Sequence, residues 1–293
     1  MWQETLLLLQ AAYEDLCNEL EGLDEAAWGM PTDFFGWTAW DEIAHLCYFD
    51  EAALLAIKDE SAFRRHATDL LELMVQGQPI SAVARSHYHQ VKPLELCRLW
   101  RERFLQLLSA LRALGPKDRL PWYGPSMSAL SFATARMMET WAHGQDIYDR
   151  LGRVRIASEV LKPIAHLGVS TFAWTFRNRQ LDVPDQVPFV DLRGPQQARW
   201  QWGEPSSSQR IQGEALDFCL VVTQRRNWQD TELTVIGPAA QSWMAIAQCF
   251  AGPPADPPRQ GERRYHPQWL ANASRLGQAL KRPKQRFASS PRI

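Results

Sequence analysis

The 293-residue sequence lacks the marks of several specialised protein classes. Its five cysteines are dispersed, without a Cys-x-x-Cys pair, so we expect reduced thiols in a core rather than a disulfide scaffold. Lysine and arginine (32) nearly balance aspartate and glutamate (33), which gives no global electrostatic case for nucleic acid or a membrane surface as partner. No apolar run reaches the roughly 18 residues of a membrane span, and the start lacks the basic region of a signal peptide. We therefore expect a cytoplasmic protein.

The sequence also lacks the common catalytic motifs. It contains no nucleophile elbow, P-loop, Rossmann glycine pattern or His-Glu-x-x-His. What it has is an ordinary globular composition, 45% hydrophobic and 22% charged, with an unusual thirteen tryptophans. Large rings serve helix packing or line ligand clefts, and their number alone does not choose between these uses. The length favours two domains.

The first domain is predicted to be helical, from residue 1 to about residue 180. Apolar residues recur three or four positions apart, and Thr38 followed by Asp41 is typical of a capping box that opens a helix. The spacing predicts long helices over residues 6–20, 38–58, 61–75, 93–114, 128–151 and 157–177. Long helices with such connections indicate a bundle.

The pattern changes after Leu181. Short apolar runs at residues 189–192, 199–202 and 231–236 are typical of strands, whereas residues 213–223 and 239–250 have helical spacing. Residues 181–255 therefore form a small α+β domain in this interpretation. Four prolines then open a basic segment, residues 256–293, which we expect to be a solvated and partly disordered tail.

A charged stripe on the predicted helix 128–151 is the most informative feature. At 100° per residue, Arg136, Glu139, His143, Asp146 and Arg150 fall within an arc of about 80°. This stripe is either a solvated face, with Glu139 and His143 as a simple i,i+4 pair, or the wall of a polar pocket inside the bundle. In the second case Glu139 and His143 stand one turn apart and could occupy adjacent positions of a metal ion. His45 is the best candidate for a third ligand.

Three segments carry a resemblance to a known family. Gly36-Trp37-Thr38, the helix around His45 and residues 138–146 (Met-Glu-Thr-Trp-Ala-His-Gly-Gln-Asp) resemble the N-terminal domain of mycothiol-dependent maleylpyruvate isomerases, within the DinB-like superfamily. The likeness covers about residues 1–177. It implies a DinB-like four-helix bundle that holds a divalent metal, most often zinc, on His45, Glu139 and His143. Residues 187–254 resemble the C-terminal extension of an uncharacterised subgroup, which is similar to a small domain named for wyosine base formation.

The resemblance implies an open catalytic metal site and, with it, a thiol chemistry. Two histidines and a glutamate leave positions free for water or a thiolate. A bound metal lowers the pKa of a coordinated thiol, which could then add to a small unsaturated acid, permit rotation about a bond and leave. Arg136 could pair with Glu139 or bind the carboxylate of a substrate. Asp146 is expected to support a ligand rather than to bind the metal itself.

Other interpretations stay open at this point. The large rings Trp37, Trp122, Tyr123 and Trp141 either line the cleft or pack in the core. The protein is either a thiol-dependent isomerase or transferase, a metal- or small-molecule-binding protein without catalysis, or a metal-dependent lyase or cyclase without a thiol. We expect a small-molecule substrate and no nucleic acid or membrane partner.

Overall fold

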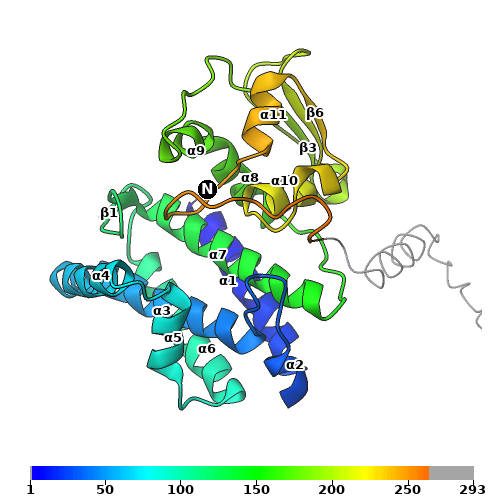
Figure 1. The fold of residues 1–293 in the computed structure, drawn as a ribbon. Coiled ribbons are helices and arrows are strands. Elements are labelled where there is room, and N and C mark those ends of the chain that lie inside the picture. Colours follow the sequence, from blue (N-terminus) through cyan, green and yellow to red (C-terminus); the bar gives the residue numbers. More distant parts are fainter. Residues whose placement is uncertain (1, 264–293) are drawn as a thin grey trace, which may run out of the picture.

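Four long helices form the helical domain. A computed structural model describes residues 2–263 of the chain. Its helices α1 (Trp2–Glu21) and α3 (Ala39–Lys58) each pack against both α6 (Pro93–Arg112) and α7 (Ala129–Arg150). This closed ring of contacts is a four-helix bundle, visible in the lower half of Figure 1. The predicted mainly helical fold is confirmed.

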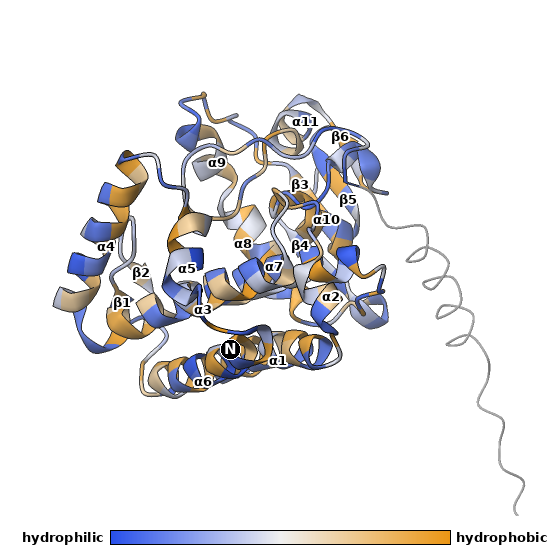
Figure 2. Cartoon of the chain, turned by 60° about the horizontal axis from the view of Figure 1, so that its bottom comes forward, coloured by the Kyte–Doolittle hydropathy of each residue, from blue (hydrophilic) through white to orange (hydrophobic). Residues whose placement is uncertain are grey.

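The bundle helices form where the sequence periodicity places them. On α1, Leu6, Leu9, Leu16 and Leu20 are buried at the three- and four-residue spacing of one helix face. At the start of α3, the Thr38 hydroxyl accepts a hydrogen bond from the Asp41 amide, and the Asp41 carboxylate accepts one from the Thr38 amide, as in a capping box. Figure 2 shows both hydrophobic and hydrophilic residues on these helices. The apolar faces meet in the middle of the bundle.

Shorter elements cover one side of the bundle. Helices α4 (Glu60–Val75) and α5 (Ile80–Tyr88) pack on α3, and α2 (Glu25–Gly29) precedes it. A two-stranded ladder, β1 (Arg119–Leu120) with β2 (Met127–Ser128), leads into α7. The sequence does not predict α5, because only two of its nine residues, Ala84 and Tyr88, are buried.

The C-terminal half is a small mixed sheet with helices. Strand order is β4 (Arg199–Trp202), β3 (Phe189–Arg193), β5 (Arg210–Glu214), β6 (Thr234–Ile236). Strands β3 and β5 are parallel, with Val190 opposite Ile211, and the other two pairs are antiparallel. The remaining elements are α8 (Leu161–Ser170), α9 (Phe172–Asn178), α10 (Ala215–Val222), α11 (Pro238–Met244) and the short 3₁₀ turns η1 (Pro195–Gln197) and η2 (Trp228–Asp230).

Several elements differ from the sequence expectation. The helix expected over residues 239–250 ends at Met244, and the strand expected over residues 231–236 begins only at Thr234. The helix expected over residues 157–177 is two helices that break at Thr171, and α8 packs against both α7 and α10. The strand β5 occupies the start of the helix expected from residue 213. A Cβ on Gly213 would lie 2.8 Å from the Leu233 side chain, so this position needs glycine for close packing rather than for a helix start.

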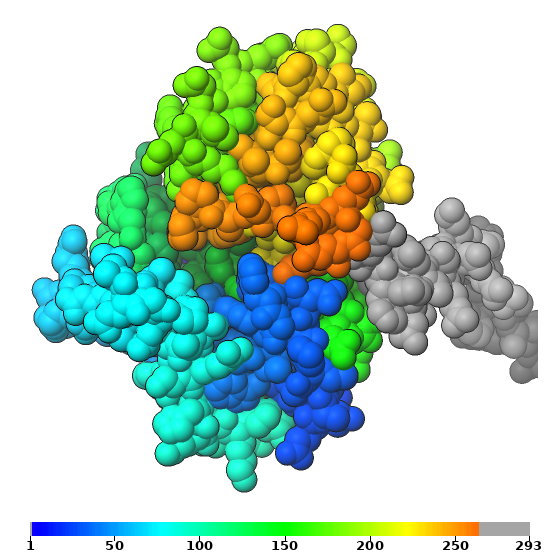
Figure 3. All heavy atoms as spheres, viewed as in Figure 1, coloured from blue at the N-terminus to red at the C-terminus, as the bar shows by residue number. Residues whose placement is uncertain are grey.

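Residues 256–263 lie across the molecule rather than free of it. The Asn227 side chain donates to the Pro258 carbonyl at 2.9 Å, and the Gly261 amide donates to Asp230 at 2.6 Å. Figure 3 shows the orange segment that includes them crossing above the helical domain. The rest of the expected basic tail lies outside the described residues. Within residues 2–263, no helix is long and apolar enough to cross a membrane, and all five cysteines are buried and unpaired.

One buried carboxylate joins all four bundle helices. Asp50 on α3 is fully buried and accepts hydrogen bonds from the Tyr13 hydroxyl of α1, the Trp100 indole of α6 and the Arg136 guanidinium of α7. These bonds are 2.7, 3.0 and 3.0 Å long. Burial raises the pKa of Asp50, and the charge of Arg136 opposes that rise. The carboxylate therefore fixes the relative positions of the four helices.

Asp50→Ala should destabilise the fold strongly. The change leaves the Arg136 guanidinium buried without its carboxylate, a defect that costs about 3–5 kcal/mol. We expect this loss in the free energy of unfolding measured in urea. Glu60→Ala breaks an exposed ion pair with Arg64 and serves as the control, with an expected loss of about 0.5 kcal/mol. Equal losses for the two variants would contradict the proposed importance of Asp50.

Candidate metal centre

Three potential metal ligands meet between α3 and α7. The Nε2 atom of His45 lies 3.7 Å from Oε2 of Glu139, and Nε2 of His143 lies 3.3 Å from the same oxygen. One atom from each of the three side chains lies within 4.8 Å of the others. Two imidazole nitrogens and a carboxylate oxygen are donors that suit zinc and leave positions open for further ligands. The residues that the sequence singles out are thus brought together.

A buried glutamate orients His143 from behind. The Nδ1 atom of His143 lies 2.6 Å from Oε2 of Glu42, whose other oxygen accepts a hydrogen bond from the Thr32 hydroxyl at 3.3 Å. This contact occupies Nδ1 and turns Nε2 toward Glu139 and His45. Carboxylate support of this kind is common behind metal-binding histidines.

Burial sets the charges of the cluster. It lowers the pKa of His143 to about 3, with a further contribution from the neighbouring His45, and it also lowers the pKa of His45. Both rings are therefore neutral near pH 7, the form that binds metals. Burial raises the pKa of Glu139, but its close contacts with His143 and His45 outweigh that effect and hold this pKa well below its usual range. An ionised carboxylate thus faces two neutral imidazoles.

Aromatic rings enclose the histidines. Trp37 stacks parallel to the His143 ring at 5.7 Å, and Phe34 meets the same ring edge-on at 5.3 Å. Phe49 packs on His45 at 4.7 Å between ring centroids. The Glu139 side chain is 24% exposed, more than either histidine, so solvent reaches the cluster beside this carboxylate.

Most of the charged stripe on α7 is buried rather than solvated, although Arg150 at its end is exposed. Arg136, His143 and Asp146 are each less than a tenth exposed. Arg136 directs its guanidinium to Asp50 and to the Leu46 carbonyl. The role of this arginine in binding a substrate carboxylate stays a prediction, and its partner in the structure is Asp50 rather than Glu139.

Asp146 does not face Glu139 and His45. It lies near the Nδ1 edge of His143, opposite the Nε2 atom that meets those two side chains. It accepts hydrogen bonds from Nε and Nη2 of Arg225, at 3.0 and 2.7 Å, and lies 3.6 Å from Nη1 of Arg263. Nη2 of Arg225 is also 3.5 Å from Nδ1 of His143. Both arginine side chains lie over the Phe34 ring. The C-terminal half of the chain therefore contributes two cations to the surroundings of the cluster.

The four large rings expected near a cleft take different places. Trp37 contacts both histidines, whereas Trp122 and Tyr123 contact Phe49, one ring further from the cluster. Trp141 is buried and packs against Arg155. Only Trp37 of these four touches the candidate ligands directly.

The sequence interpretation missed Glu42 and Arg225. Glu42 precedes His45 by three residues, the same one-turn spacing that separates His143 from Asp146 on α7, so this signal was present on α3. Arg225 is separated from Asp146 by 79 residues. No local pattern predicts which buried carboxylate a distant arginine meets.

Comparisons with known proteins agree with this architecture. Residues 9–148 match the family model of the mycothiol maleylpyruvate isomerase N-terminal domain. Two Mycobacterium tuberculosis proteins, described as uncharacterized protein Rv0036c and uncharacterized protein MT0041, are 41% identical to the chain over 248 residues, which cover 84% of this chain and 95% of each relative. The chain belongs to their family.

Solved structures extend the likeness in fold. The crystal structure of the mycothiol-dependent maleylpyruvate isomerase superimposes with a TM-score of 0.50 at 17% identity, covering 75% of this chain and 88% of that one. A mutant of that enzyme gives the same score and coverage at 16% identity. The family model ends at residue 148, so it gives no support to the expected wyosine-base-formation likeness of residues 187–254.

Arg225→Met should destabilise the protein through Asp146. Both partners of this ion pair are 4% exposed, and removing the guanidinium leaves the carboxylate with only the more distant Arg263. We expect a loss of about 3 kcal/mol in calorimetric unfolding. Arg199→Met is the control, because Arg199 is 67% exposed in its pair with Asp191 and its removal should have a much smaller effect. A loss no larger than that of the control would show that the Arg225 pair contributes little.

Proposed function

We propose that the protein is a zinc-dependent enzyme that uses a low-molecular-weight thiol to isomerise a small unsaturated acid. The observation that carries the proposal is the convergence of His45, Glu139 and His143 beside a solvent-exposed edge, within a domain of the mycothiol maleylpyruvate isomerase type. Zinc bound by these three residues would keep an open position, where it would lower the pKa of a coordinated thiol.

The proposed reaction balances without an oxidant or reductant. A thiolate would add to one carbon of the substrate double bond, whose electron pair would pass to the conjugated carbonyl group, and the resulting single bond could rotate. Return of that electron pair would expel the same thiolate and restore the double bond in the other geometry. The enzyme therefore ends in its starting state, and only the configuration of the acid has changed. If the thiol stayed attached after addition, the same site would act as a transferase.

The chain's own residues would position the reacting groups. Glu42 holds the Nδ1 edge of His143, and Arg136 holds α3 against α7 through Asp50. Asp146 holds Arg225 beside His143. Trp37 and Phe34 cover the His143 ring and would exclude water from that side. In this proposal, Arg136 and Asp146 position other residues and do not touch the substrate. The alternative is that Arg136 binds the carboxylate of the substrate directly.

His45→Ala and His143→Ala should each lose most of the bound metal. Two remaining ligands hold zinc poorly, so we expect near one zinc per chain in the natural protein and a small fraction of that in the variants, measured by elemental analysis. His89→Ala is the matched control, because this exposed histidine bonds only the Ser86 carbonyl. Full occupancy in both folded variants would overturn the ligand assignment.

Glu42→Gln should weaken zinc binding while leaving all three ligands in place. The loss of a carboxylate behind a metal-binding histidine costs about 10- to 100-fold in metal affinity. Competition with a chromogenic chelator measures the change. Glu60→Gln, an exposed glutamate on α4, should bind zinc as the natural protein does. An unchanged zinc affinity in Glu42→Gln would show that Glu42 does not support the metal site.

Thiol binding is testable on cobalt-substituted protein. A thiol that enters the coordination shell should produce an intense sulfur-to-metal charge-transfer band, and His143→Ala should abolish it. If no tested thiol perturbs the cobalt spectrum while an acid is still turned over, the thiol step is wrong and the metal acts as a Lewis acid or a source of hydroxide. If neither a spectrum change nor turnover is found with any thiol, a metal-binding role without catalysis is favoured.

A further inference from the structure

Two of the five cysteines lie on the seam between α1 and α6, away from the candidate metal ligands. On α1, Cys17 follows Tyr13 by one turn, and on α6, Cys97 precedes Trp100 by one turn. The Tyr13 ring stacks on the rings of Trp100 and Phe104, with 5.0 and 3.8 Å between ring centroids. Because side chains three or four residues apart share a helix face, both cysteines continue this seam into the next turn.

The two thiols touch each other close to solvent. The Cys17 thiol donates a hydrogen bond to the Cys97 sulfur. Four residues after each cysteine, Glu21 and Arg101 form an exposed ion pair, with 3.3 Å between Oε1 and Nη1. Cys97 is 7% exposed, the largest value among the five cysteines, and Cys17 is 5% exposed. The seam therefore ends at the surface one turn beyond the pair of thiols.

The surroundings of Cys97 favour its thiolate form. The hydrogen bond from Cys17 and the charges of Arg101 and Arg98 lower the pKa of Cys97, against the opposing effects of burial and of Glu21. The same hydrogen bond raises the pKa of Cys17. Burial raises the pKa of the other three cysteines, Cys47, Cys219 and Cys249. The seam thus holds one nucleophilic sulfur directly beside a second thiol, the arrangement seen at oxidation-sensitive cysteines.

We propose that Cys17 and Cys97 form a site of reversible oxidation, at which a hydroperoxide converts the two thiols to a disulfide. The Cys97 thiolate attacks one oxygen of the hydroperoxide and becomes a sulfenic acid, and the other oxygen leaves as hydroxide or alkoxide. The Cys17 sulfur then attacks the Cys97 sulfur, the S–S bond forms, and the sulfenic oxygen leaves as water. The two thiols are oxidised and the hydroperoxide is reduced, so electrons and atoms balance.

The disulfide cross-links two bundle helices beside the buried carboxylate that joins all four. Tyr13 and Trp100, one turn from the two sulfurs, both donate hydrogen bonds to Asp50. The bond closes a loop of about 80 residues, and a closed loop of that length strongly restricts the unfolded chain. We therefore expect the oxidised protein to unfold at a higher urea concentration than the reduced protein.

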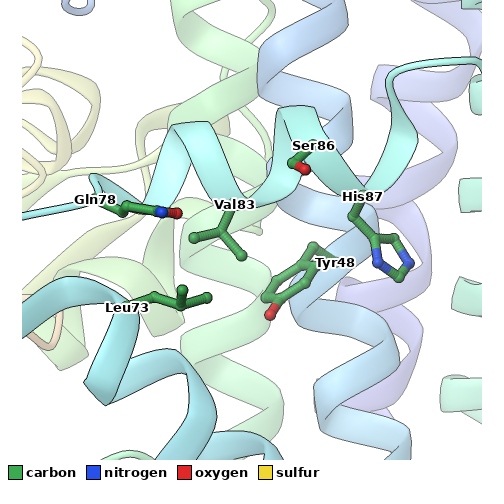
Figure 4. A pocket seen from close by; sticks show the side chains of 6 residues that line it. All are labelled: Tyr48, Leu73, Gln78, Val83, Ser86 and His87. Carbon is green, nitrogen blue, oxygen red and sulfur yellow. The ribbon is translucent and has the colours of Figure 1, made fainter. Parts of the chain in front are cut away.

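Cys47 is a control thiol within the same chain. It is fully buried on α3, where α5 packs against this helix. Figure 4 shows the next residue, Tyr48, beside His87 of α5, and 5.6 Å separate the two ring centroids. A thiol enclosed in this way should stay reduced under conditions that oxidise Cys97.

The test treats the full chain with hydrogen peroxide and maps its cysteines by mass spectrometry after free thiols are trapped. We expect a linked peptide that joins Cys17 to Cys97 in the natural protein, and its loss on addition of dithiothreitol. In Cys17→Ser, Cys97 should stop at the sulfenic acid, which dimedone traps. In Cys97→Ser, Cys17 should be oxidised about tenfold more slowly, because its pKa is not lowered.

Cys219→Ser is the matched control variant. Cys219 is fully buried and donates to the Leu161 carbonyl at 3.4 Å, a contact that a serine hydroxyl can keep, so this variant should form the linked peptide at the natural rate. The proposal is overturned if the natural protein yields no linked peptide, if Cys47 is oxidised as fast as Cys97, or if the linked protein unfolds at a lower urea concentration than the reduced one. These three outcomes need only the natural protein. Neither zinc nor turnover enters the measurement, so its result is independent of the proposed isomerase function.

Discussion

The register between α3 and α7 is the constraint on which the candidate metal centre depends. Three polar pairs join these antiparallel helices: Asp50 with Arg136, His45 with Glu139, and Glu42 with His143. Residue numbers fall along α3 as they rise along α7, so each pair fixes the neighbouring ones. The Asp50–Arg136 pair is fully enclosed and also binds α1 and α6, which makes it the anchor. A slip of one helix turn would separate the candidate metal ligands and leave buried charges unpaired.

Local patterns in the sequence were sufficient for the bundle helices, but not for the contacts between them, and the resemblance to a known family was needed to assemble the three candidate ligands as a set. The capping box at Thr38 and the apolar stripe on α1 are short-range signals, and the structure confirms both. The spacing of Glu139 and His143 is equally local. Whether their face was solvated depended on what packed against it, and helix periodicity carries no information about that partner. Arg136 illustrates the difference, because its true partner, Asp50, lies 86 residues away.

The elements that the sequence missed have weak or competing local signals. Helix α5 buries only Ala84 and Tyr88, so its periodicity is short. In β5 the buried positions are Ile211 and Gly213. Glycine is uncommon in strands, so the close packing of Gly213 against Leu233 could not be predicted from the local pattern. Strands β3 and β5 pair in parallel although β4 lies between them in the sequence. Strand propensity alone does not predict such a long-range pairing.

The α+β half of the chain is a structural part of the candidate site rather than a separate appendage. Arg225 reaches both Asp146 and the Nδ1 edge of His143, and Arg263 reaches Asp146 and Phe34. Glu42 and Asp146 are buried acids of the helical half, and burial raises the pKa of each. Arg225 opposes that effect at both acids and Arg263 opposes it at Asp146, since a nearby cation favours the ionised carboxylate. The C-terminal half therefore helps to set the charge behind His143, and a helical domain without it would present the same three ligands in a different electrostatic environment.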